Sequence, residues 1–182
     1  MLANDVLGAG SQLTATSLLR PWDEERFLAV GYRQWLNRQG SMLRVNASEY
    51  RQTVQDGPGL VGIDDLTQQR RIDVSVQHPL RLDQRTVLMA AAGIYGLNYQ
   101  RGFTERASGA QLVTQEHVRA LYAQLDWTSA QERTVRNASL MLVHGLNALG
   151  AGTERSTNFG VEPAPNPAKL AFWRLAWDAG LR

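Results

Sequence analysis

The residues best suited to chemistry in this chain lie near its middle, in a glycine-rich turn followed by two carboxylates. Gly57, Gly59 and Gly62 have the spacing of a dinucleotide-binding fingerprint. That motif needs a strand before it and a helix N-terminus after it, so that backbone N–H groups point at pyrophosphate. Here a predicted helix precedes the turn, a proline interrupts it, and Asp64 and Asp65 follow with like charge. We therefore predict no nucleotide site.

Histidine, acidic and nucleophilic side chains offer no second candidate. His78, His117 and His144 are isolated, without a second ligand at the spacing that metal sites use. Asp64 and Asp65 could hold a cation or form an acid/base pair, although neighbouring carboxylates in a loop usually cap turns and face water. The chain has no cysteine and no serine in a nucleophile-elbow context. We predict no catalytic residue, no metal site and no cofactor, and therefore a protein that is not an enzyme.

Arginine is the dominant cation, since 18 of the 19 basic residues are arginine and Lys169 is the only lysine. Its planar guanidinium suits bidentate pairing with carboxylate or phosphate, but a codon bias would give the same counts. Six arginines gather near the ends of the central apolar segment: Arg70, Arg71, Arg81, Arg85, Arg101 and Arg106. They could contact phosphate, carboxylates across an interface, or only solvent. The net charge of only +2 disfavours non-specific nucleic-acid binding.

Length and composition indicate one folded domain. With 182 residues, of which 43% are apolar and 20% charged, the chain has ordinary globular values. It lacks the run of about 20 apolar residues that predicts a membrane-spanning helix. Its N-terminus lacks the basic, apolar and small-residue series of a secretory signal. We expect a cytoplasmic or virion location and no membrane span.

The elements that should position these residues are organised around Thr86–Tyr99, TVLMAAAGIYGLNY. Ten of its fourteen residues are apolar and none is charged. We predict a helix over about 86–100, capped by Asp83 and apolar on every side, which other elements must enclose. Gly93 and Gly96 would let a neighbouring element approach its backbone closely.

Helical spacing of apolar residues elsewhere predicts a mainly α fold, a helical bundle around this buried central helix. We expect further helices over about 21–38, 46–55, 114–125 and 129–149, with Gly40 ending the first. Alternating apolar residues predict a strand over 71–77, ended by His78 and Pro79, and a second short strand is expected over 42–45. The expected organisation is an N-terminal arm (1–16), a helical core domain (17–150), and a linker with a C-terminal helix (151–182).

The predicted C-terminal helix carries the candidate interface. Asn166 and Pro167 have the pattern of a helix start, and Trp173 and Trp177 then lie on one stripe with Phe172 beside it. Each aromatic side chain can bury roughly 150–250 Å², so both indoles need shelter. Either this helix folds onto its own core or it docks on another subunit.

The run Leu80–Arg101, LRLDQRTVLMAAAGIYGLNYQR, and the two arms together resemble the head-to-tail connector proteins of tailed bacteriophages. Those proteins are small, mainly helical subunits that form rings beneath the portal and grip their neighbours with extended arms. The resemblance covers 22 of the 182 residues and assigns no functional residue. It implies a virion structural role.

These observations predict a non-enzymatic structural subunit of a symmetric multimeric assembly, specifically a phage connector or neck protein. Its partners would be copies of itself and other structural proteins of that assembly. The alternative is an arginine-using helical module that binds nucleic acid within a larger complex. A third hypothesis, an enzyme of unfamiliar type, requires a polar pocket that brings together at least two of His78, His117, His144, Asp64 and Asp65.

Overall fold

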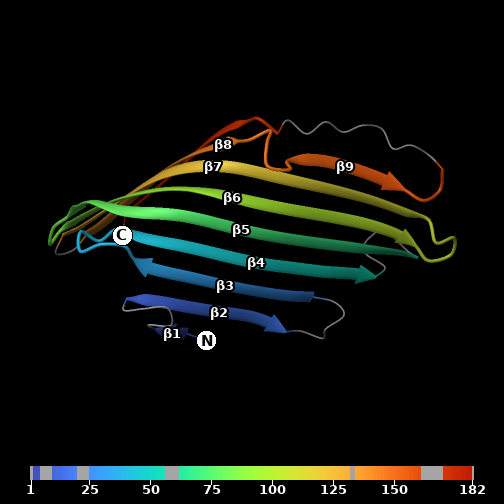
Figure 1. The fold of residues 1–182 in the computed structure, drawn as a ribbon, viewed down its shortest axis with the longest axis horizontal. Coiled ribbons are helices and arrows are strands. Elements are labelled where there is room, and N and C mark those ends of the chain that lie inside the picture. Colours follow the sequence, from blue (N-terminus) through green and yellow to red (C-terminus); the bar gives the residue numbers. More distant parts are fainter. Residues whose placement is uncertain are drawn as a thin grey trace.

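A computed structural model describes residues 2–4, 10–19, 25–55, 62–131, 134–160 and 170–181. These residues form one sheet (Figure 1) of ten strands: β1 (Leu2–Asn4), β2 (Ser11–Leu19), β3 (Glu25–Trp35), β4 (Met42–Gln55), β5 (Ile63–Leu82), β6 (Thr86–Glu105), β7 (Gln111–Gln131), β8 (Thr134–Gly145), β9 (Gly152–Thr157) and β10 (Trp173–Leu181). No helix occurs in the described ranges. The predicted mainly α fold and helical bundle are therefore wrong.

The strands follow one another across the sheet in chain order, and each neighbouring pair is antiparallel (Figure 1). β10 pairs with the outer edge of β8. β9 pairs with β7 beyond the end of β8, so β8 and β9 share one edge of β7 and are separated by residues 146–151. β5, β6 and β7 have 20, 20 and 21 residues, far above the usual 5–6 or so.

Two residues that were predicted to bound helices instead shape hairpin turns. Asp83 Oδ1 accepts hydrogen bonds from the N–H groups of Arg85 (3.0 Å) and Thr86 (2.6 Å), which closes the β5–β6 hairpin. Gly40, expected to end a helix, lies in the β3–β4 turn with a φ of +88°. The capping chemistry is present in the sequence, but it serves tight turns between strands.

The strand predicted over 71–77 is confirmed as part of β5, and that predicted over 42–45 is the start of β4. His78 and Pro79 do not end β5, which continues to Leu82. The register of β5 against β6 shifts between Pro79 and Arg81. Because proline has no N–H for the ladder, an irregularity at this point lets the strand continue.

The central segment Thr86–Tyr99 lies in β6, with β5 on one edge and β7 on the other. Apolar residues fall on both faces of this strand, so the segment shows no alternation that would separate a strand from a buried helix. Alanine favours helix by propensity, but pairing along both edges overrides that preference. The predicted enclosed helix is therefore a central strand with partly exposed side chains.

The two predicted arms belong to the sheet where they are described. Ser11–Leu19 pairs with β3, and the expected C-terminal helix is the strand β10. The helix start predicted at residue 21, the first two glycines of the 57–62 turn and the helix start at 166–167 lie outside the described residues.

The sheet has no hydrophobic core of its own. Ala120 and Val143 are the buried apolar residues in the described part of the chain, and no large side chain there is fully buried. The accessible surface is 12698 Å², whereas a compact protein of 20.2 kDa would expose roughly 8,800 Å². Since stable domains pack at least two layers around a core, this single layer needs another component against one of its faces.

Candidate functional site

The two faces of the sheet differ in chemistry, and β5 shows the difference most clearly. Ile72 and Val74 are 60% and 37% exposed, whereas Asp73 and Ser75 between them are 8% and 6% exposed. In globular proteins the apolar side chains of a half-buried strand point inward and the polar ones outward. Here the order is reversed. We call the side of Ile72 the apolar face and the side of Asp73 the polar face.

Cross-strand register extends the apolar face over most of the sheet, because directly paired residues point to the same side. The apolar-face residues form an apolar band over Val30–Tyr32 of β3, Leu43–Ala47 of β4, Ile72–His78 of β5, Leu88–Gly96 of β6, Leu121–Trp127 of β7, Ala138–His144 of β8 and Trp173–Ala179 of β10. No Asp, Glu, Lys or Arg occupies the apolar face within these ranges, although Arg81 pairs with Leu88 and Arg119 pairs with Gly96 in the two outermost rows of β6. Along β6 the band is about 27 Å long, at ~3.4 Å per residue.

Aromatic and polar residues mark the margins of the apolar band. Tyr32 and Trp173 lie in one cross-strand row near one margin, and Trp127 lies at the other. Two residues beyond Ile72 on the same face, the next row contains Arg70 and, paired with it, Asn98. The apolar band therefore changes to a polar surface within one row.

The polar face carries a network over Gly93 of β6. Tyr122 Oη donates a hydrogen bond to Asp73 Oδ1 (3.1 Å), and Asp73 Oδ2 lies 3.7 Å from an Arg71 nitrogen. The Arg71 guanidinium also lies 4.7 Å from the centre of the Tyr95 ring. Burial raises the pKa of Tyr122, and the Asp73 carboxylate raises it further. The charged and aromatic side chains of this network thus interact with one another through a hydrogen bond, an ion pair and a cation–π contact.

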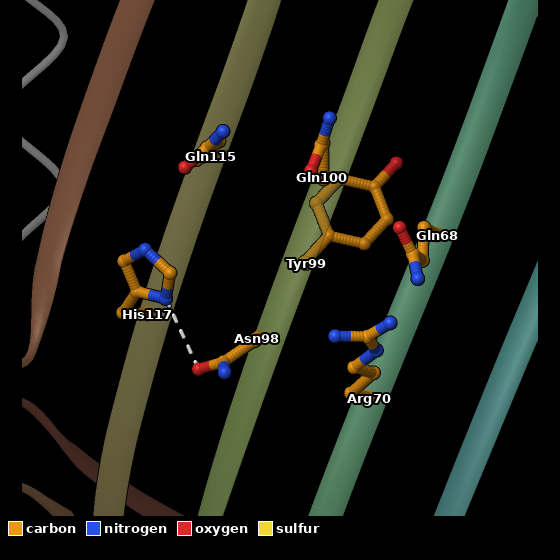
Figure 2. A pocket seen from close by; sticks show the side chains of 7 residues that line it. All are labelled: Gln68, Arg70, Asn98, Tyr99, Gln100, Gln115 and His117. Carbon is orange, nitrogen blue, oxygen red and sulfur yellow. Dashed lines mark hydrogen bonds between the residues drawn. The ribbon is translucent and has the colours of Figure 1, made fainter.

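A small polar pocket lies on the apolar-face side just beyond the band (Figure 2). Its volume is about 130 Å³, and it is lined by residues of three adjacent strands: Gln68, Arg70, Asn98, Tyr99, Gln100, Gln115 and His117. Asn98 Oδ1 accepts hydrogen bonds from His117 Nδ1 (3.0 Å) and Arg119 Nη1 (2.9 Å). With its oxygen used twice, the Asn98 amide has its Nδ2 donors left for a ligand.

The charge balance beside this pocket depends on Glu49. Its carboxylate lies 3.1 Å from Arg26 and 3.5 Å from Arg70, and it accepts a hydrogen bond from Gln68. Burial pushes the pKa of Glu49 upward, but Arg70, Gln68 and Arg26 together outweigh burial and leave that pKa below its ordinary value. One carboxylate shared by two arginines leaves a net positive charge at the pocket.

An apolar groove adjoins the polar pocket and shares Arg70 and Asn98 with it. Its volume is about 340 Å³, and it is lined by Ile72, Val74 and Ile94 and, at one side, by Arg119. Gly96, which has no side chain, also lines the groove. The groove thus runs from the apolar band to the polar pocket.

Arg119 lies within β7, between the part of that strand that pairs with β9 and the part that pairs with β8. Its Nε donates to the carbonyl of Leu149 (3.2 Å), and its Nη1 donates to the carbonyls of Leu97 (3.3 Å) and Val118 (2.9 Å). The Leu146 N–H donates to the Arg119 carbonyl (2.7 Å). Arg119 therefore supplies donors where the regular ladder is interrupted.

The structure does not bring the predicted arginine cluster together. Arg81 and Arg85 lie at the β5–β6 hairpin, whereas Arg101 lies near the opposite end of β6. Ion pairs join Arg70 to Glu49, Arg71 to Asp73, Arg81 to Asp83, Arg101 to Asp65 and Arg106 to Asp64. Phosphate contact by these residues stays a prediction, and Arg70 is the one that lines a pocket on the apolar-face side.

The predicted interface residues lie at the edge of the sheet. Trp173 and Trp177 are 69% and 77% exposed on the apolar face of β10. Trp173 stacks on His144, with 4.2 Å between ring centres, while the partly buried Phe172 contacts Gly145. The indoles do not fold onto a core of this chain, and an outside partner for them stays a prediction.

The candidate histidines and carboxylates are dispersed. His78 bonds to Ser41 near the hairpin end, His117 lines the polar pocket, and His144 lies in the apolar band. Asp64 and Asp65 point to opposite faces. No group of three or more potential metal ligands occurs among the described residues.

Sequence reasoning missed the apolar face and Asn98, and it assigned Gly96 only to the close approach of a neighbouring element. The missed signal was period-two alternation, clearest in β10, where Trp173, Leu175, Trp177 and Leu181 alternate with Arg174, Ala176, Asp178 and Gly180.

No described segment forms a helix with the length and hydropathy that spanning a membrane requires. Comparison with protein-family models, curated proteins and solved structures finds no match to this chain.

Proposed function

We propose that this chain is a membrane-integral protein whose strands cross a lipid bilayer, with the apolar band against acyl chains and the polar face against water. The observation that supports it is the reversed alternation, in which Ile72, Val74 and Val76 are exposed while Asp73 and Ser75 are sheltered. Membrane-crossing strands alternate apolar residues toward lipid with polar residues toward an aqueous interior.

The dimensions and margins of the band favour lipid over a protein partner. Its length of about 27 Å along β6 is close to the lipid-facing band of about 25 Å in strand-built membrane proteins. Its three inner rows, those of Ala90, Ala92 and Ile94, contain no Asp, Glu, Lys or Arg. Arginines stand in the two outermost rows, where Arg81 pairs with Leu88 and Arg119 pairs with Gly96. Tyr32, Trp127 and Trp173 near its margins match the aromatic girdles at the two membrane interfaces.

Backbone pairing is consistent with this environment. Hydrocarbon offers no hydrogen bonds, so strands can cross it only when every edge is paired. Strands β3 to β8 are paired on both sides along much of their length. β10 contains no proline that would block a further ladder, and its charged residues are Arg174 and Asp178 on the polar face. We infer that a strand of another copy or of further polypeptide pairs with the outer edge of β10.

The second candidate is the structural subunit of a symmetric assembly. The exposed apolar face supports it too, since a second copy packed there would complete a two-layer domain. The connector resemblance was carried by a helical run Leu80–Arg101 and two arms, and that run belongs to strands β5 and β6 with the turn between them, so the resemblance adds no support for a virion role. Nucleic-acid binding stays an untested alternative.

Two substitutions on opposite faces of β7 separate these functions. Protein refolded into phosphatidylcholine vesicles should float with them after an alkaline wash. Leu125→Arg puts a charge near the middle of the β7 part of the band and should weaken insertion by about 2–4 kcal/mol. Gln124→Arg, one residue away on the polar face, should insert like the parent. A parent that stays out of vesicles and forms a discrete oligomer would support the assembly subunit instead.

A further inference from the structure

We propose that the polar pocket and the adjoining groove form a binding site for one anionic phospholipid, with its phosphate at Arg70 and Asn98 and an acyl chain along Ile72, Val74 and Ile94. This inference rests on the proposed function, because it places the pocket at the margin of the bilayer. The inference assigns a specific class of lipid to this part of the surface, whereas the rest of the apolar band would contact lipids of any class.

The polar pocket lies at the margin of the apolar band. Arg70 and Asn98 lie on the apolar-face side, one row beyond Ile72 and Gly96. A lipid whose acyl chain lies against the band carries its phosphate at this level. Basic pockets at this depth are typical lipid headgroup sites.

Arg70 and Asn98 present hydrogen-bond donors to the polar pocket. The Arg70 side chain is 63% exposed, and its guanidinium lies 3.5 Å from the Glu49 carboxylate. Arg26 lies closer to the same carboxylate, at 3.1 Å, and balances its charge. The Asn98 oxygen is occupied by His117 and Arg119, so its amide donors remain available. A guanidinium and an amide presenting N–H groups together suit phosphate oxygens.

The polar pocket and the apolar groove are continuous. The pocket and the groove share Arg70 and Asn98, so one molecule with a charged head and an apolar tail fits both. The Arg119 side chain lies over Gly96, where a built Cβ would meet it at 3.5 Å, and it forms one wall of the groove. A free anion would use the pocket and leave the groove empty.

The test measures lipid binding to the protein folded in uncharged detergent, by native mass spectrometry with phosphatidylglycerol and phosphatidylcholine. Phosphatidylglycerol should bind about fivefold more tightly, the factor that corresponds to one charge pair about 4 Å apart in water, ~1 kcal/mol. Arg70→Gln should bring that ratio close to one. Arg44→Gln, which removes the same charge from the polar face, should leave it unchanged.

A second pair of variants tests the groove. Gly96→Val fills it and should weaken both lipids alike, whereas Ala92→Val, on the same face of β6 but outside the groove, should weaken neither. Equal binding of the two lipids by the parent, or displacement of phosphatidylglycerol by inorganic phosphate, would overturn the lipid site while leaving the membrane proposal intact. Failure of the parent to enter vesicles would overturn both.

Discussion

The Tyr122 hydroxyl of β7 donates a hydrogen bond to Asp73 Oδ1 of β5 over 3.1 Å, reaching across Gly93 of the strand between them. A Cβ built on Gly93 would lie 2.9 Å from Tyr122 Cε1 and 2.6 Å from the Val74 carbonyl oxygen. The absence of a side chain at residue 93 therefore lets the tyrosine lie flat enough to reach the carboxylate.

Gly93→Ala should consequently destabilise the folded protein by about 1–3 kcal/mol, the usual cost of overpacking. Gly96→Ala is the matched control in the same strand, because its new Cβ makes only ordinary contact at 3.5 Å. Urea unfolding in detergent micelles measures both. Equal midpoints for the two variants would contradict the role of Gly93.

Tyr122 should ionise later than an ordinary tyrosine. Burial, reinforced by Asp73, raises the pKa of Tyr122 above 10.0. Its contribution to folding is fully present below pH 10.0, the ordinary value, and is lost as the pH rises through the higher folded-state pKa. Burial and Glu25 also raise the pKa of Tyr50, so ultraviolet titration of the phenolates should show two late components. Tyr122→Phe should remove one of them and Tyr50→Phe the other, and a Tyr122→Phe titration with both late components intact would refute the assignment.

The β5–β6 hairpin should loosen in acid. The backbone N–H of Arg85, the Arg81 side chain and the Thr86 N–H hold the pKa of Asp83 below its ordinary value of 3.8. The stabilising contribution is therefore present above pH 3.8 and is lost as the pH falls through the lower folded-state pKa. The Thr86 amide resonance should titrate in this acid range, and in Asp83→Asn it should stay flat. A Thr86 resonance that titrates in both proteins would point to another carboxylate.

Arg119→Gln should destabilise the backbone where β7 changes its partner from β9 to β8, without disturbing β10. Three backbone carbonyls, those of Leu97, Val118 and Leu149, lose a guanidinium donor in this variant. Hydrogen exchange should accelerate at the Leu146 and His117 amides and stay unchanged at Trp177. Uniform acceleration across the sheet would show a global effect instead.

The sequence supported the correct prediction where alternation was unambiguous, as in Ile72, Val74 and Val76 of β5. It misled where spacing fitted both periods: Leu28 and Tyr32 are four apart, as on a helix, but Val30 between them completes a strand pattern. Ala90–Ala92 favours helix by propensity, and only pairing with β5 and β7, which local spacing cannot reveal, makes it strand.

The polar pocket could not be predicted from spacing either. Arg70, Asn98 and His117 come from three strands, and only the register of β5, β6 and β7 makes them neighbours. Charge makes Arg70 a candidate for phosphate or carboxylate contact, and His117 is a candidate only as a metal ligand or as a member of a reactive polar pocket. The strand register pairs Arg70 with Asn98 and Asn98 with His117, which places the three residues in one cross-strand row.

The most direct test of the central claim uses the absence of native cysteine, which makes single-cysteine variants unambiguous. Cysteines placed one at a time at residues 121–127 of β7 are labelled with a fluorophore in vesicles. Brominated acyl chains should quench labels at residues 121, 123, 125 and 127, and aqueous iodide should quench those at 122, 124 and 126. Quenching by iodide at every position, with no alternation, would contradict a membrane-crossing sheet.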